Sequence, residues 1–240
     1  MCYSWIMKKP TIEFNISKEY EGIFDKPEPA RNSIPEWWKR QSRYQREDVH
    51  TYNSKGEVSH TIKRCMPVMD AMVTGYVIKL PSDLVVQQVH GDPVFIWGFT
   101  EWTLLSPHNP EQVTEYPKDD RWHKQPLKFI NPWAIRTPKG YSCLFTAPMH
   151  GDKVPFHVLD GIVDTDVFNV PVNFPFFIED GFEGTIPAGT PIVQVIPFKR
   201  EEWNSEYKYI TKDDHNKLRA SSRFVKDRYM KFFRQPKNFS

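Results

Sequence analysis

Twenty-one prolines in a chain of 240 residues set the strongest limit on what this sequence can fold into. Proline has no backbone N–H donor, so it interrupts helices and is excluded from the interior of central strands. We therefore expect short elements separated by turns, and we exclude long helices over most of the chain.

Six short windows between residues 70 and 166 are rich in β-branched and aromatic residues and bounded by turn residues. They are residues 70–81, 83–91, 93–105, 128–138, 140–148 and 156–166. This spacing is typical of all-β sandwiches and barrels. We expect a mainly β protein whose residues 51–204 form a distorted β-barrel or jelly roll.

Two windows show helical spacing instead, one on each side of the β-rich region. In the N-terminal extension, residues 1–50, Ser33 can cap a short helix over residues 35–46 with Pro35 in its first turn. In the C-terminal region, residues 205–240, Thr211 and Asp214 have the spacing of a capping box. Apolar side chains then recur at helical spacing, at Leu218, Val225, Tyr229 and Phe232. We expect the basic, aromatic tail past Pro236 to lie over another surface.

Charge and cysteine content exclude several classes of partner and site. The 32 Lys and Arg against 30 Asp and Glu leave a net charge of +2, so no global field favours nucleic acid. Cys2, Cys65 and Cys143 are too few and too far apart for a disulfide framework or a thiolate zinc site. With no run of 18 apolar residues, we expect no membrane partner and a location in the cytoplasm or in a virion.

Three segments after residue 131 follow one another in an informative order. They read NPWAIRTPKGYSCLF, GIVDTDVFNVPVNF and IPAGTPIVQVIPF. Residues 131–200 thereby resemble the core of the dUTPase and dCTP-deaminase superfamily, in which a Gly-Tyr strand, a Gly-x-Ile-Asp-x-Asp turn and a Gly-Asp-x-Ile-Ala-Gln-Leu strand occur in this order. The resemblance implies a β-clip fold, often trimeric, with a nucleotide held at subunit boundaries.

The same resemblance assigns candidate site residues. It implies that Asp164 orients an attacking water near a Mg²⁺-bound triphosphate and that Asp166 holds the turn. Tyr141 and Gln194 become candidate ligand-binding residues, and we expect the Gln194 amide to hydrogen-bond to backbone within its apolar strand. We also expect both aspartates and the Gly189 turn to share one rim of the barrel.

Departures from the family pattern weaken the enzymatic interpretation. Val167 stands where the family has an aromatic residue, APMHG (residues 147–151) replaces an Arg-Ser-Gly phosphate clasp, and no Gly-rich, Arg-containing flap follows Phe198. A triphosphate would lose most of its charge-assisted hydrogen bonds. We expect a noncatalytic or catalytically degenerate β-clip protein, with no cofactor, that acts through self-association, as a trimer, or docks in a larger assembly. The alternative is a Mg²⁺-dependent deoxynucleoside triphosphate hydrolase or deaminase, and Asp164 and Asp166 are also common turn formers.

The whole chain also resembles a protein family of about this length that occurs in tailed phages and some bacteria. The segments that carry this likeness are IPEWWK, KRCMPVMDAMVTGY, TPKGYS and QVIPFKREEW. The likeness implies a phage origin and a phage or host protein as partner, and it implies no particular activity.

Two further constellations have chemical interpretations. His150 and Asp152 have the His-x-Asp spacing of the iron site in jelly-roll Fe²⁺/2-oxoglutarate oxygenases, but the later histidines, His157 and His215, are poorly placed to complete it. A structural turn is the simpler interpretation. Cys143 lies within a strand, and we expect its thiol to point inward and stay protonated.

Overall fold

The structure, a computed structural model, describes residues 9–44, 60–98, 101–117, 119–223 and 229–240. The body is mainly β, as expected, and every strand pair in these ranges is antiparallel. Most strands are short, which agrees with the frequent prolines. None of the helices in these ranges is long and apolar enough to cross a membrane.

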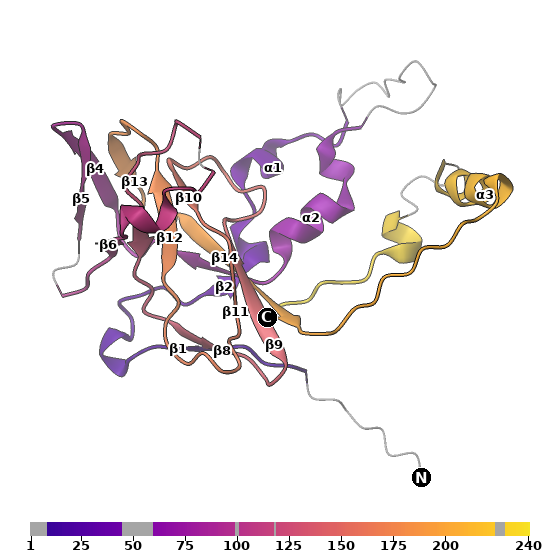
Figure 1. The fold of residues 1–240 in the computed structure, drawn as a ribbon, viewed down its shortest axis with the longest axis horizontal. Helices are drawn as coiled ribbons and strands as arrows, with labels where there is room; N and C mark the ends of the chain where they lie inside the picture. The colour runs from indigo at the N-terminus through magenta and orange to yellow at the C-terminus, as the bar shows by residue number, and fades with distance from the viewer. Residues whose placement is uncertain (1–8, 45–59, 99–100, 118, 224–228) are drawn as a thin grey trace, which may run out of the picture.

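Four sheets make up the body (Figure 1). The largest has the order β11 (Gly161–Val163), β9 (Tyr141–Thr146), β14 (Pro191–Lys199), β3 (Tyr76–Lys79) and β2 (Glu28–Pro29). The second has the order β10 (Phe156–Val158), β12 (Phe174–Ile178), β7 (Leu127–Phe129) and β6 (Leu105–Pro107). The smaller sheets are β13 (Gly184–Ile186), β4 (Leu84–Val89) and β5 (Asp92–Trp97), and the pair β1 (Glu13–Asn15) and β8 (Ala134–Arg136).

One apolar core joins the two larger sheets. Phe145 of β9 lies 5.8 Å from Phe174 of β12, measured between ring centroids. Phe129 and Phe176 stack at 4.0 Å within the second sheet. Burial of such large side chains is the main favourable contribution to folding, and the contact at Phe145 holds the motif-bearing sheet in place.

The expected closed barrel is wrong for the described strands, which form open sheets. Only Leu159 and Asp160 separate β10 from β11, yet the two strands join different sheets. The outer strands β11, β10, β6 and β2 have three residues or fewer. Closing a barrel requires edge strands that pair continuously, and these strands are too short to do so.

The short helix of the N-terminal region is smaller than expected. α1 covers Glu36–Arg40, because the backbone of Gln41 is already extended. Ser33 does not cap it, since its hydroxyl donates to Glu28 Oε1 at 2.8 Å. Residues 45 and 46 of the expected helix lie outside the described residues. The same region also contributes β1 and β2 to the sheets.

A second helix lies partly where the sequence predicted a strand, at residues 70–73. α2 covers Met66–Val73, with Pro67 in its first turn, so residues 70–73 are helical. Gly75, at φ +76°, then turns the chain into β3. Four short 3-10 turns complete the body: η1 (Lys18–Tyr20), η2 (Ala30–Ser33), η3 (Ile62–Arg64) and η4 (Pro110–Val113).

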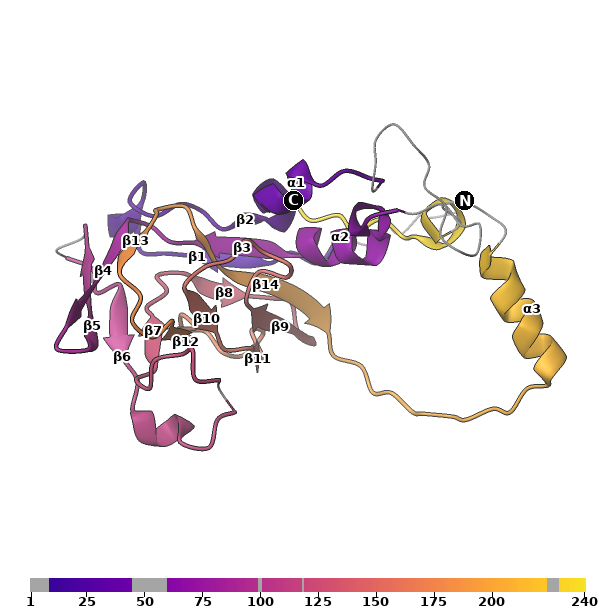
Figure 2. The same ribbon diagram turned by 90° about the horizontal axis from the view of Figure 1, so that it is seen from above.

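The C-terminal helix starts where the sequence predicts. α3 covers Lys212–Arg223, and the Asp214 N–H donates to Thr211 Oγ1 at 3.1 Å. Val225 lies outside the described residues, and Tyr229–Phe233 form one π-helical turn, η5, instead of continuing the α-helix. Figure 2 shows α3 apart from the body, with the tail returning to α2 and β3.

Gly75 offers a test of the contact between this turn and β14. A Cβ at this position would lie 2.1 Å from the Val195 carbonyl oxygen, in addition to the positive φ. We expect Gly75→Ala to lower the free energy of unfolding by roughly 3 kcal/mol or more, measured by chemical denaturation. In the control Gly22→Ala, φ is +83° and no atom lies within 4 Å of the added Cβ. This variant should lower the free energy of unfolding by only about 1–2 kcal/mol. Equal losses would show that the close approach does not matter.

Candidate functional site

The aspartates singled out by the sequence lie where three adjacent strands end. Asp164 and Asp166 follow β11, and Arg200 follows β14. β9 lies between these two strands and is antiparallel to both, so its first residue, Tyr141, lies beside Lys199. Residues far apart in the sequence therefore meet at one end of the five-stranded sheet.

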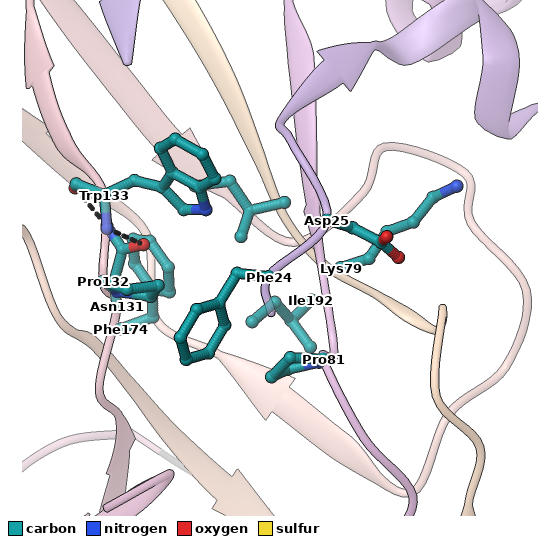
Figure 3. A pocket seen from close by; sticks show the side chains of 10 residues that line it. Phe24, Asp25, Lys79, Pro81, Asn131, Pro132, Trp133, Phe174 and Ile192 are labelled. Atoms are coloured by element: carbon teal, nitrogen blue, oxygen red, sulfur yellow. Dashed lines mark hydrogen bonds between the residues drawn. The ribbon is translucent and has the colours of Figure 1, made fainter. Parts of the chain in front are cut away.

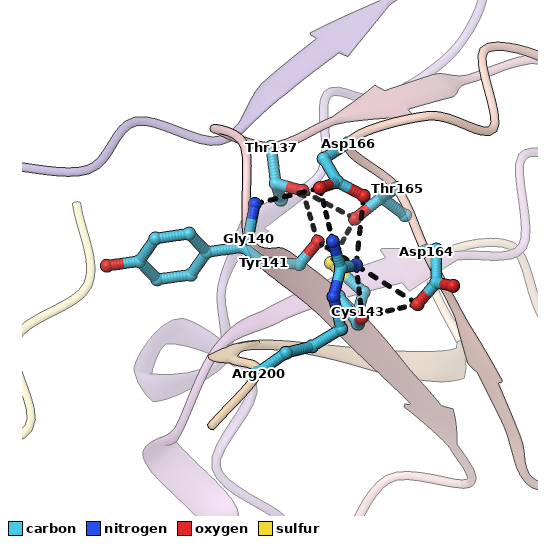
Figure 4. Close-up of polar contacts among 9 residues, drawn as sticks. Thr137, Gly140, Tyr141, Cys143, Asp164, Thr165, Asp166 and Arg200 are labelled. Carbon is cyan, nitrogen blue, oxygen red and sulfur yellow. Dashed lines mark hydrogen bonds and ion pairs between the residues drawn. The ribbon is translucent and has the colours of Figure 1, made fainter. Parts of the chain in front are cut away.

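Arg200 is the centre of this cluster (Figure 4). Its Nη1 donates to Asp164 Oδ1 at 3.1 Å and to Asp166 Oδ1 at 2.9 Å. Its Nη2 donates to Asp166 Oδ2. The Tyr141 carbonyl oxygen accepts from Nη1 at 3.0 Å. One guanidinium thus bridges the ends of all three strands.

The two carboxylates differ in their surroundings. The Asp166 side chain is 3% exposed, whereas that of Asp164 is 59% exposed. Arg200 and, after it, the Gly140 N–H, which donates to Asp166 Oδ2 at 2.8 Å, lower the pKa of Asp166 to about 2. Ser142 Oγ donates to Asp164 Oδ1 at 2.7 Å. Asp166 is therefore a fixed anion, and Asp164 is a surface carboxylate with one oxygen engaged.

The residue between the acids faces inward. Thr165 is fully buried, and its hydroxyl lies 2.7 Å from Thr137 Oγ1 and donates to Cys143 Sγ at 3.4 Å. Burial raises the pKa of the Cys143 thiol to about 11. The thiol points inward and is protonated, as expected from its place in the strand, so it is not a ready nucleophile.

An open groove of about 650 Å³ runs beside Asp166. The Tyr141 side chain contributes to its wall and points away from the Arg200 cluster in Figure 4. The charged residues that line the groove are Lys9, Glu13, Arg136 and Asp166. Two cations are offset by two anions, so these residues present no excess positive charge to a triphosphate.

Arg200 also decides whether the acids suit a divalent cation. Mg²⁺ prefers carboxylate oxygens with several waters retained. Here the guanidinium holds one oxygen of Asp164 and both oxygens of Asp166. As arranged, the two aspartates do not fit a shared metal ion.

Gln194 is held by backbone groups, as expected. The residue is only 1% exposed, and its side-chain Nε2 donates to the carbonyl oxygens of Ala71 at 2.9 Å and Thr74 at 2.6 Å. Its Oε1 accepts from the Met149 N–H at 2.9 Å. The amide thus joins β14 to the end of α2 and to the turn after β9. This arrangement leaves neither amide hydrogen for a ligand.

His150 and Asp152 lie in a turn that supports α1. The His150 carbonyl oxygen accepts from Trp37 Nε1 at 2.8 Å, and Asp152 Oδ2 accepts from the Glu36 N–H at 3.1 Å. His157 instead stacks on Trp122 at 5.6 Å. Among the described residues no three His, Cys, Asp or Glu side chains are grouped as metal ligands. This donor set does not fit the iron site considered from the sequence.

The expectation that the Gly189 turn shares a rim with the aspartates is wrong. Gly189 precedes β14 and donates its N–H to the Leu80 carbonyl oxygen at 2.8 Å, whereas Arg200 follows β14. Because β14 has nine residues, the two turns are separated by roughly 30 Å along an extended strand. The strand order β11-β9-β14 places the aspartates beside its far end.

Other cavities lie elsewhere in the body, and two of them adjoin the N-terminal region. One, shown in Figure 3 between Phe24, Trp133 and Ile192, has a volume of about 20 Å³, enough for roughly one water molecule. The other is a proline-rich, mainly apolar groove of about 480 Å³ between α1, β13 and the start of β14.

Comparison with known proteins identifies no relative. A scan against protein-family models, a search of curated proteins and a search of solved structures each found no match. The geometry of the site is therefore the basis for its interpretation.

Sequence reasoning missed the residue that organises the site. Arg200 directly follows the longest strand, and a cation directly after an apolar strand could have marked it as a candidate, but its acidic partners depend on the strand order. The roles of Gly140 and Ser142 depend on the strand order, which the sequence does not reveal.

The pKa of Asp166 leads to a test. Because its pKa is lower in the folded than in the unfolded chain, the ion pair stabilises the fold above about pH 4, and this contribution is lost as the pH falls towards about 2. We expect Asp166→Asn to melt at a lower temperature than the wild type near neutral pH, with the two converging in acid. Asp164→Asn should show a smaller difference. A constant gap between Asp166→Asn and wild type at every pH would contradict the ion pair.

Gln194 gives a second test of the same sheet. Gln194→Leu would leave the Ala71 and Thr74 carbonyls and the Met149 N–H without their buried partner. We expect a loss of about 3 kcal/mol or more in the free energy of unfolding. The matched control Gln87→Leu, at an exposed position of β4, should change stability by about 0.5 kcal/mol or less. Similar stability of the two variants would argue against a structural amide.

Proposed function

We propose that this protein is a noncatalytic β protein, of the β-clip type and phage-encoded, that functions by self-association within a larger assembly. The observation that carries the proposal is the segment after β14. We call residues 201–223 and 229–233 the arm. Each of residues 201–218 is exposed, and the hydrogen bonds of Thr211 with Asp214 and the ion pair of Glu206 with Lys208 join residues within the arm.

The arm carries an unusual number of exposed large apolar side chains. They are Trp203, Tyr207, Tyr209, Ile210, Leu218, Tyr229, Met230, Phe232 and Phe233, and the exposed fraction reaches 86% at Trp203 and 100% at Tyr209. Aromatic residues and methionine are enriched at protein interfaces, and contiguous exposed apolar surface marks a binding site. An arm of this composition fits a protein partner.

The charges of the arm do not single out nucleic acid as its partner. The arm, residues 201–223 and 229–233, contains five acidic side chains and six Lys or Arg. Nucleic-acid binding depends on neutralising phosphates with Lys and Arg. With its charges so nearly balanced, the arm offers little net attraction for a phosphate backbone, despite its aromatic residues.

The catalytic alternative has less support. In a nucleotide hydrolase, Asp164 would direct water beside a metal-bound triphosphate, but Arg200 and Ser142 share its Oδ1, and the adjoining groove has balanced charge. Turnover of deoxynucleoside triphosphates with Mg²⁺ that is abolished by Asp164→Asn would replace our proposal with that alternative.

Light scattering coupled to size exclusion tests self-association. We expect a mass above the 28.4 kDa of one chain, three times that value if the β-clip trimer applies. The variant with Trp203→Ser, Tyr207→Ser and Tyr209→Ser should elute as a monomer with the melting temperature of the body unchanged.

The control removes exposed apolar side chains from the body instead. Ile23→Ser with Ile62→Ser changes residues that are 47% and 48% exposed and should keep the wild-type mass. A wild-type protein that is monomeric over the whole concentration range, or an arm variant that still associates, would contradict the proposal.

A further inference from the structure

The tail beyond the arm, residues 234–240, binds the body through specific contacts. Arg234 donates to Asp70 Oδ1 from Nε at 3.0 Å and from Nη2 at 2.7 Å. Asp70, on α2, has a side chain only 8% exposed, and Lys237 Nζ lies 3.5 Å from its Oδ2. We call Asp70 and Tyr76 the tail dock. The Asp70 carboxylate makes the dock specific for a cationic tail, because a buried carboxylate without a cationic partner would destabilise the fold.

Tyr76 completes the dock at the end of the tail. Its hydroxyl donates to the Ser240 carbonyl oxygen at 3.1 Å, and its ring meets the Phe239 ring edge-on at 5.9 Å between centroids. Tyr76 itself is 9% exposed and belongs to the core strand β3. The end of the tail therefore contacts a side chain that belongs to the core strand β3.

Much of the arm that leads to this dock is exposed, including each of residues 201–218. Figure 2 shows it as a wide loop that leaves the sheet after β14 and carries α3 away from it. α3 has 12 residues, a length at which isolated helices are marginal in water. The extended residues 201–211 can reach roughly 35 Å, which is comparable with the width of a body of this size.

We propose that in the assembled protein the tail of one copy binds the tail dock of a second copy. Every contact of Arg234, Lys237 and Phe239 can form unchanged between copies, as in other exchanges of a terminal element. The arms of the two copies then run between the bodies, where their exposed aromatic residues pack against one another. This inference rests on the proposed self-association and names the contact that produces it.

Charge reversal tests the exchange. Asp70→Arg and Arg234→Asp each place like charges at the dock and should weaken association roughly thirtyfold or more. In a mixture of the two variants, opposite charges meet only between copies, because each variant then supplies the dock for the tail of the other. We expect association, measured by light scattering, to return on mixing. The double variant Asp70→Arg with Arg234→Asp is the control for tolerance of the reversed pair.

A second measurement keeps the wild-type dock intact. Phe239 is replaced by the photo-crosslinking residue benzoylphenylalanine. Chains of this variant with normal and with heavy nitrogen are mixed and refolded together. After irradiation, the crosslinked peptides are identified by mass spectrometry. Crosslinks between tail and β3 peptides of different isotopes support the exchange. Crosslinks confined to peptides of one isotope overturn it, as does failure of the mixed variants when the double variant associates.

The outcomes separate this inference from the proposed function. An assembly whose crosslinks all lie within one chain would overturn the tail exchange and leave self-association standing. A monomeric wild-type protein would overturn both.

Discussion

Two arginines fix the ends of the arm, and the proposed assembly depends on them. Arg200 binds the carboxylates of Asp164 and Asp166 where β14 ends, and Arg234 binds Asp70 on α2. Bidentate pairing of a guanidinium with a carboxylate is directional as well as strong. The arm therefore leaves and rejoins the structure at defined positions, although it contributes little to the core.

The same residues bear on the likeness to nucleotide enzymes that the sequence indicates. A hydrolase needs an acid that can act on water and cations that can bind phosphate. In this structure Asp166 is committed to Arg200 and Gly140, and Gln194 is committed to α2 and the turn after β9. In this structure the two acids stabilise the joint between three strands.

The sequence predicted local features well and spatial relations poorly. The mainly β character, the start of α3 at Thr211, the inward thiol of Cys143 and the backbone contacts of Gln194 all follow from local pattern and burial. The predictions of a closed barrel and of a shared rim were wrong because both depend on strand order and strand length. The hydrophobic periodicity of a sequence does not determine either property. α2 was missed because its apolar residues continue directly into β3, and a short apolar run is ambiguous between helix and strand. Arg200 could not be paired with its acids without knowing that β11, β9 and β14 are neighbours.

Hydrogen–deuterium exchange of the intact protein at low and high concentration measures whether another copy covers the arm. Exchange reports local opening and solvent access of individual backbone amides. If another copy covers the arm, peptides from residues 201–223 exchange rapidly in dilute solution and become protected as the concentration rises, while peptides from β9 and β14 do not change. Rapid exchange of the arm at every concentration would contradict such coverage.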